Sequence, residues 1–170
     1  MTAGDLQFED ATDADWPAIW RIFREVVSAG DTYTFAPDTS EPVARAMWMP
    51  DVAVRRVTYV ARLDGEVVGT AFLRPNGPVG GGSDHVANAG WMIAPGASGR
   101  GIGRRFAEHV IDDARRRGYR AMQFNAVVET NERAVALWLS LGFEIVGTVP
   151  GAFRHPGRGL VGLHVMWRGL

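Results

Sequence analysis

The sequence contains no cysteine and no lysine, and each absence excludes a class of chemistry. Without cysteine there is no disulfide bond, no thiolate nucleophile and no cysteine-ligated metal site. Because all 18 basic residues are arginines, Walker-type phosphate loops and lysine Schiff bases are excluded as well. The four histidines lack the H-E-x-x-H spacing of a zinc-binding helix, so we expect no metal centre.

Long apolar runs and an excess of charge of one sign are also missing. No run approaches the roughly 18 apolar residues of a membrane-spanning helix, and the first residues do not resemble a signal peptide. The net charge of −1 gives no overall field that would attract nucleic acid. We therefore expect a cytoplasmic protein with no nucleic acid or membrane partner, folded as one domain over residues 1–170.

Hydrophobic periodicity and turn residues predict an α+β protein built on a mixed sheet. Helical patterns occur at residues 15–28, from residue 40 onward, at 100–117 and at 131–141. Strand patterns occur at residues 6–11, 57–63, 66–74, 85–94, 121–128, 143–149 and 160–168. Asp64-Gly65 predicts a tight hairpin between the second and third of these strands.

A glycine-rich turn, Ser98-Gly99-Arg100-Gly101-Ile102-Gly103, follows the strand at residues 85–94 and opens the next helix. Glycines allow several backbone N–H groups to turn inward together, and the helix N-terminus adds partial positive charge. Such a turn can bind a pyrophosphate, although an ordinary strand-to-helix turn has a similar composition. The dinucleotide fingerprint does not fit, because its third glycine would stand at Arg104.

The region resembles the GCN5-related N-acetyltransferases, the GNAT superfamily, whose signature is Arg/Gln-x-x-Gly-x-Gly/Ala after a Val-x-Pro strand end. Residues 93–95 read Ile-Ala-Pro before the glycines, and residues 131–143 resemble the family's Asn-x-x-Ala-x-x-Leu-Tyr-x-x-x-Gly-Phe segment. The resemblance covers residues 6–168 by element order and is specific from residue 87 to 143. It implies a mostly antiparallel sheet of about seven strands, flanked by four helices, with the fourth and fifth strands splayed apart.

The resemblance also implies an activity: transfer of an acetyl group from acetyl-coenzyme A (acetyl-CoA) to the amine of a small molecule or peptide. The amine would attack directly in a ternary complex, without a metal. Backbone N–H groups of the glycine-rich turn would bind the pyrophosphate, and the fourth strand would pair with the pantetheine arm. The implied coenzyme-binding residues are Trp91, Met92, Ile93, Ser98, Gly99, Arg100, Gly101, Ile102, Gly103, Arg104, Asn131 and Trp138.

The sequence departs from the family pattern at two of these positions. Ser98 stands where arginine or glutamine is usual, which keeps the backbone donor but loses a long side chain. Trp138 stands where many members have a tyrosine that is thought to protonate the departing thiolate. An indole N–H cannot act as an acid and only donates a hydrogen bond, so Trp138 is equally well explained as a core residue.

The usual positions of the general base are occupied by Ala87, Ala89 and Ala126, none of which can accept a proton. The remaining candidates for a catalytic role are Asn125 (through a bound water), Tyr33 and His85, with Glu129 and Asp31 as alternatives. Each of them also has a simple structural or surface explanation. Because an amine attacks only when it is neutral, a site without a strong base would suit a weakly basic amine or rely on a chain of water molecules.

The resemblance places the acceptor between the loop after the first helix and the last two strands. Candidate substrate-binding residues are Asp31, Tyr33, Phe35, Phe153 and Arg154, and an arginine there suits an acceptor carboxylate. The empty acid and base positions leave open a non-catalytic acyl-CoA-binding or sensing domain. A longer acyl chain, an alcohol acceptor and a homodimer also stay open.

Overall fold

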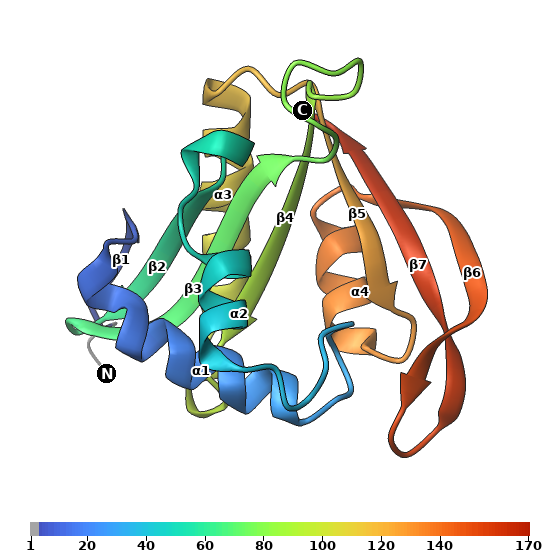
Figure 1. Ribbon diagram of the computed structural model, residues 1–170, viewed down its shortest axis with the longest axis horizontal. Coiled ribbons are helices and arrows are strands. Elements are labelled where there is room, and N and C mark those ends of the chain that lie inside the picture. Colours follow the sequence, from blue (N-terminus) through green and yellow to red (C-terminus); the bar gives the residue numbers. More distant parts are fainter. Residues whose placement is uncertain (1–3) are drawn as a thin grey trace.

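The computed structural model describes residues 4–170, which form seven strands and four α-helices (Figure 1). The strands are β1 (Leu6–Asp10), β2 (Val57–Leu63), β3 (Glu66–Pro75), β4 (Val86–Ile93), β5 (Ala121–Val128), β6 (Glu144–His155) and β7 (Gly159–Gly169). The helices are α1 (Trp16–Ser28), α2 (Glu41–Trp48), α3 (Ile102–Arg116) and α4 (Glu132–Ser140). Within residues 4–170, no helix has the length and apolar character needed to cross a membrane.

The strands form one sheet in the order β1-β2-β3-β4-β5-β7-β6. Every neighbouring pair is antiparallel except β4 and β5, which are parallel. Figure 1 shows α1 and α2 in front of the first four strands and α3 and α4 behind the sheet. The predicted α+β fold with a mixed, mostly antiparallel sheet is therefore confirmed.

Helices on both faces give the protein two apolar cores. Ile19 and Phe23 of α1 lie one turn apart and are fully buried, as is Trp48 of α2. On the other face, Phe106 and Val110 of α3 are fully buried with the same spacing. Because the central strands are covered on both sides, they read as nearly continuous apolar runs.

The strand predicted at residues 143–149 is longer than expected, because β6 continues to His155. Pro150 would interrupt a central strand, but β6 is the edge strand of the sheet. Its register with β7 shifts between Val149 and Phe153, which is the kind of irregularity that tolerates proline. Phe153 and Arg154 therefore lie in an extended hairpin and not in a loop.

Candidate active site

The parallel strands β4 and β5 pair only at Val86↔Ala121 and Ala87↔Met122. Beyond these two pairs β4 continues along β3, while β5 continues along β7. The sheet is thus open between β4 and β5 over the second half of β4, as Figure 1 shows. The splay of the fourth and fifth strands is confirmed.

The opening exposes one set of backbone groups of β4. Hydrogen bonds from Asn76 N–H to Val86 C=O and from Ala94 N–H to Val68 C=O lie at the two ends of the β3–β4 ladder. In an antiparallel pair every second residue bonds to the partner strand. The even-numbered residues of β4 therefore bond to β3, and the odd-numbered ones, Trp91 among them, direct N–H and C=O toward β5.

The glycine-rich turn joins the open end of β4 to α3. Gly99 and Gly101 have φ of +79° and +74°, the left-handed region that favours glycine. Gly101 is the N-cap of α3, and a Cβ added to either glycine would meet no atom within 4 Å. The turn therefore offers open backbone next to the free N–H groups of a helix N-terminus, which suits a phosphate group.

The charged side chains near this turn differ in their surroundings. Arg100 is exposed on the loop, as is Ser98. The Arg104 guanidinium donates a hydrogen bond of 2.5 Å to Ser140 Oγ and lies 3.6 Å from a carboxylate oxygen of Glu108. Arg104 is thus engaged with α4 and its own helix, so the backbone N–H groups and the exposed Arg100 are the donors available at the turn.

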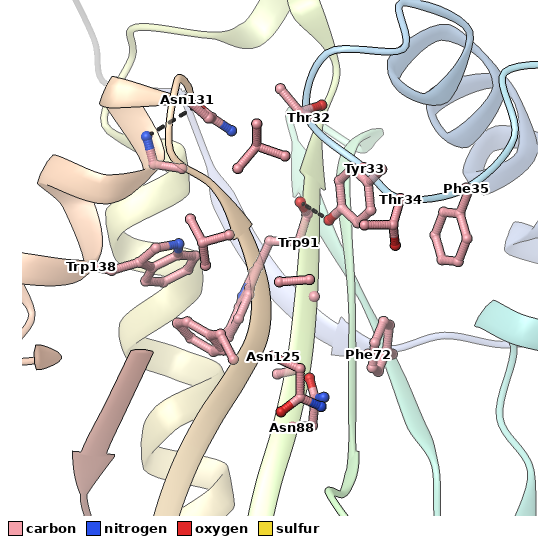
Figure 2. A pocket seen from close by; sticks show the side chains of 17 residues that line it. Thr32, Tyr33, Thr34, Phe35, Phe72, Asn88, Trp91, Asn125, Asn131 and Trp138 are labelled. Carbon is pink, nitrogen blue, oxygen red and sulfur yellow. Dashed lines mark hydrogen bonds between the residues drawn. The ribbon is translucent and has the colours of Figure 1, made fainter. Parts of the chain in front are cut away.

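A cavity of about 290 Å³ lies beside the opening between β4 and β5 (Figure 2). Its lining comes from the α1–α2 loop, three strands and α4. The lining residues are uncharged and comprise residues 32–35, Phe72, residues 88–91, residues 124–128, and Asn131, Ala134 and Trp138. The cavity therefore offers amide, hydroxyl and aromatic groups, and no carboxylate, guanidinium or imidazole.

Trp138 forms the α4 side of this cavity as part of an aromatic cluster. Its ring centroid lies 4.7 Å from that of Trp91 and 4.8 Å from that of Phe124. Only 8% of Trp138 is exposed. The tryptophan is therefore a packed core residue, as one of the two explanations from the sequence has it, and it also lines the cavity.

Tyr33 reaches the cavity from the α1–α2 loop and holds that loop to β4. Its hydroxyl donates a 2.6 Å hydrogen bond to the Trp91 carbonyl, drawn in Figure 2. Burial raises the pKa of the Tyr33 phenol well above its ordinary value. The phenol is therefore neutral, and its proton is already donated, so Tyr33 is not suited to accept a proton from an amine.

We expect Tyr33→Phe to keep most of the activity and to lose modest stability. Loss of one buried hydrogen bond costs about 1 kcal/mol, and the phenyl ring can still stack on Phe35, 5.6 Å away. Thermal unfolding and steady-state kinetics of the variant test this expectation. A fall in kcat of roughly 100-fold or more would instead show that Tyr33 transfers a proton.

The two asparagines predicted from the sequence line opposite parts of the cavity. Asn131 is the N-cap of α4, where its side-chain oxygen accepts a 3.3 Å hydrogen bond from the Ala134 N–H. This bond leaves the amide nitrogen of Asn131 for a ligand. Asn125 lies on β5 at the other end and donates a 2.8 Å hydrogen bond to Asn76.

Four other candidates do not line the cavity. His85 lies at the paired end of β4, in a separate hollow with Arg55 and Tyr119. Phe153 is buried against Val128 and Val161. Arg154 of β6 is exposed and does not line the cavity. Asp31 immediately precedes residues 32–35, the part of the α1–α2 loop that lines the cavity.

Glu129 is held elsewhere as well. Its carboxylate accepts a 2.5 Å hydrogen bond from the Gly162 N–H of β7. A Cβ on Gly162 would lie 2.6 Å from that carboxylate, so glycine is needed for the contact. Glu129 therefore links the end of β5 to β7 by a hydrogen bond. It does not line the cavity.

Several lining residues had no expected role from the sequence, notably Phe72 and Asn88. Phe72 lies in the predicted hairpin, and its ring packs edge-on against Trp48 at 4.9 Å. Asn88 is a polar residue inside an otherwise apolar strand, and that interruption is a usable signal. Thr32 and Thr34 belong to the loop after the first helix that was expected beside the acceptor, and Ala134 belongs to the segment that resembles the family.

Comparison with known proteins agrees with this architecture. The model of the acetyltransferase (GNAT) family matches residues 16–143. A GCN5-related N-acetyltransferase from Kribbella flavida is 54% identical, with a TM-score of 0.92 over 97% of this chain and 98% of that one. N-acetyltransferase aca1 of Schizosaccharomyces pombe is 32% identical over 108 residues, which are 64% of this chain and 49% of that protein.

The chain thus spans about half the length of the Schizosaccharomyces relative. A GNAT superfamily phosphinothricin acetyltransferase from Sinorhizobium meliloti, solved in complex with acetyl-CoA, is 23% identical with a TM-score of 0.85. The aligned region covers 97% of this chain and 88% of the Sinorhizobium protein. At this identity, the likeness shows that the two proteins share a fold. Because the family model matches well over half of the chain, including the opening between β4 and β5 and the glycine-rich turn, the chain belongs to the GNAT acetyltransferase family.

Proposed function

We propose that the protein is an N-acetyltransferase that moves the acetyl group of acetyl-CoA to the amine of a small molecule or peptide. The observation that supports this proposal best is the arrangement along β4: the uncharged cavity lies at residues 88–91 beside the open side of the strand, and the glycine-rich turn follows the end of the strand. Together these features outline a path for acetyl-CoA. A thioester supplies an activated acyl group, and the path has a donor set for each part of such a molecule. The related structure with bound acetyl-CoA has the same fold.

Each part of the path has a distinct task in this proposal. The N–H groups around Gly99 and Gly101 hold the pyrophosphate with the help of the α3 N-terminus. The Trp91 N–H, directed into the opening, donates to the acyl oxygen and stabilises the negative charge that develops there. The aromatic wall around Trp138 excludes water, and Asn131 offers its amide nitrogen.

The cavity lacks side chains that could accept or donate a proton at neutral pH during the reaction. None of its lining residues is an aspartate, glutamate or histidine. Rate enhancement would therefore come from positioning and from polarisation of the thioester carbonyl. Deprotonating a lysine-like amine at pH 7.5 costs about 4 kcal/mol, whereas an α-amino group costs less than about 1 kcal/mol. The cavity thus favours a weakly basic amine.

The pH dependence of kcat/KM should follow the acceptor and not the enzyme. We expect kcat/KM to rise tenfold per pH unit below the pKa of the acceptor amine and to level off above it. Because burial raises the pKa of Tyr33, its ionisation produces no decline up to about pH 9.5. An inflection near pH 6 to 7 shared by acceptors of different pKa would contradict this, since it would reveal an enzyme base.

The same lack of an acid and a base favours one alternative, a domain that binds acyl-CoA without transferring the acyl group. Release of free CoA thiol from acetyl-CoA in the presence of an amine panel separates the two functions. Amine-dependent release supports the acetyltransferase. Tight binding of acetyl-CoA with no release above the buffer rate supports the sensor.

A further inference from the structure

Four carboxamide side chains form one hydrogen-bonded cluster across the opening between β4 and β5. Asn88 donates to the side-chain oxygen of Asn76 at 3.1 Å, and Asn125 donates to the same oxygen at 2.8 Å. Gln123 donates to the side-chain oxygen of Asn125 at 2.8 Å. Asn88 and Asn125 both line the cavity, and Figure 2 shows them side by side at its lower end.

The bonds within this carboxamide cluster determine which groups remain for a ligand. The oxygen of Asn76 accepts two hydrogen bonds and that of Asn125 accepts one. Within the cavity, the side-chain oxygen of Asn88 and the second amide N–H of both Asn88 and Asn125 therefore remain for a ligand, whereas Asn76 and Gln123 do not line the cavity. The cluster offers donors and acceptors together, with no net charge, which is the pattern that another amide group complements.

Charged anchors are a poorer match for this end of the cavity. An ammonium group would meet no carboxylate among the lining residues. The cross-strand neighbour of Asn88 is Arg74. The Arg74 guanidinium donates to the Pro75 carbonyl and does not line the cavity, so it does not form a carboxylate site there.

The spacing also restricts the acceptor. Asn88 lies three residues before Trp91 on β4, roughly 10 Å along the strand. Both residues line the same cavity of about 290 Å³, which suits a small acceptor with only a few bonds between amine and anchor. The anchoring group therefore lies next to the reacting amine.

We propose that the carboxamide cluster binds an amide directly adjacent to the reacting amine, so that the acceptors are α-amino amides. This class includes amino-acid amides and the first residue of a peptide. The inference rests on the proposed acetyltransferase function. It agrees with the missing base, because an α-amino group has a pKa of about 7.7 to 8.0 and is at least about half neutral at pH 8.

The test compares four acceptors of similar size with the full chain: L-alaninamide, L-alanine methyl ester, L-alanine and 1,3-diaminopropane. The ester has a similarly weakened amine but no amide N–H, L-alanine tests a carboxylate anchor, and the diamine tests a cationic one. We expect kcat/KM for the amide to exceed that of each of the others by roughly tenfold. Equal values for amide and ester, or a preference for L-alanine or the diamine, would overturn the inference.

Variants locate the preference in the carboxamide cluster. Asn88→Leu keeps the branched skeleton of the side chain without its polar groups. It should lower kcat/KM for alaninamide about tenfold, the effect of one lost hydrogen bond, while the value for the methyl ester changes less than about threefold. Gln7→Leu, an amide removed from the exposed strand β1, is the matched control and should change neither value. An equal loss for amide and ester in Asn88→Leu would contradict an amide anchor.

Binding separates failure of this inference from failure of the proposed function. If no amine is acetylated, the acetyltransferase proposal fails, and binding of N-acetyl-L-alaninamide to the native protein still tests the anchor. Weaker binding to Asn88→Leu than to Gln7→Leu supports the amide anchor. Equal binding to both variants, or none to the native protein, overturns it.

Discussion

Replacing Gly101 with valine should weaken the binding of acetyl-CoA about 100-fold. Gly101 has φ of +74° at the N-cap of α3, a conformation that a β-branched residue adopts only under strain. The turn must therefore change its backbone path, and N–H groups that face the pyrophosphate move away. Loss of two charge-assisted hydrogen bonds, at about 1.5 kcal/mol each, corresponds to that factor. Isothermal titration calorimetry measures it directly.

Gly118 supplies a matched control at the other end of the same helix. Its φ is +86°, and a Cβ there would meet no atom within 4 Å, as at Gly101. Gly118→Val thus imposes similar backbone strain without touching the proposed pyrophosphate site. We expect comparable losses of stability in the two variants but unchanged affinity in Gly118→Val. Equal affinities for acetyl-CoA in both variants would argue against the turn as the binding site.

Trp138→Ala should destabilise the protein by about 3 kcal/mol. The ring is packed against Trp91 and Phe124 and lies 5.8 Å from Phe143 by ring centroids. Its removal leaves a large space between α4 and the sheet that the surrounding strands cannot fill. Urea unfolding, followed by circular dichroism at the wavelength of the helix signal, gives the change in unfolding free energy.

The neighbouring Leu139 is the natural comparison for Trp138. It lies on the same helix but is 48% exposed, so Leu139→Ala should cost less than about 1 kcal/mol. Similar costs for the two substitutions would show that Trp138 is not part of the core. A third variant, Trp138→Tyr, tests the acid: an increase in kcat beyond about tenfold would show that this position can protonate the thiolate.

The parts of the site that could be predicted are those with local causes. The turn at Gly99 and Gly101 is encoded by glycines that tolerate positive φ, and it lies where a strand pattern changes to a helix pattern. The Asp64-Gly65 hairpin is local in the same way, and both flanking strands agree with their predicted ranges to within a residue. Asn131 is recognisable because it is a helix cap as well as a cavity residue.

The parts that could not be predicted depend on residues far apart in the chain. Alternation along β4 predicts that His85 faces the same side of the sheet as Ala87. However, β4 and β5 are paired at Val86 and Ala87, so His85 lies next to the paired end of these strands and away from the opening. The carboxamide cluster joins Asn76 to Asn125 across 49 positions. Pro150 is a strand breaker by local rules, but the edge position of β6 accommodates it, which moves Arg154 away from the cavity.

The central claim is that the opening between β4 and β5 brings the thioester of acetyl-CoA to an amine in the uncharged cavity. The most direct test follows acetyl-CoA labelled with carbon-13 at the carbonyl by NMR, with the protein and L-alaninamide. We predict that the thioester carbonyl signal is replaced by that of an amide, with one CoA thiol released per amide formed. A thioester signal that persists while acetyl-CoA is bound, or that is replaced only by free acetate, would contradict the claim.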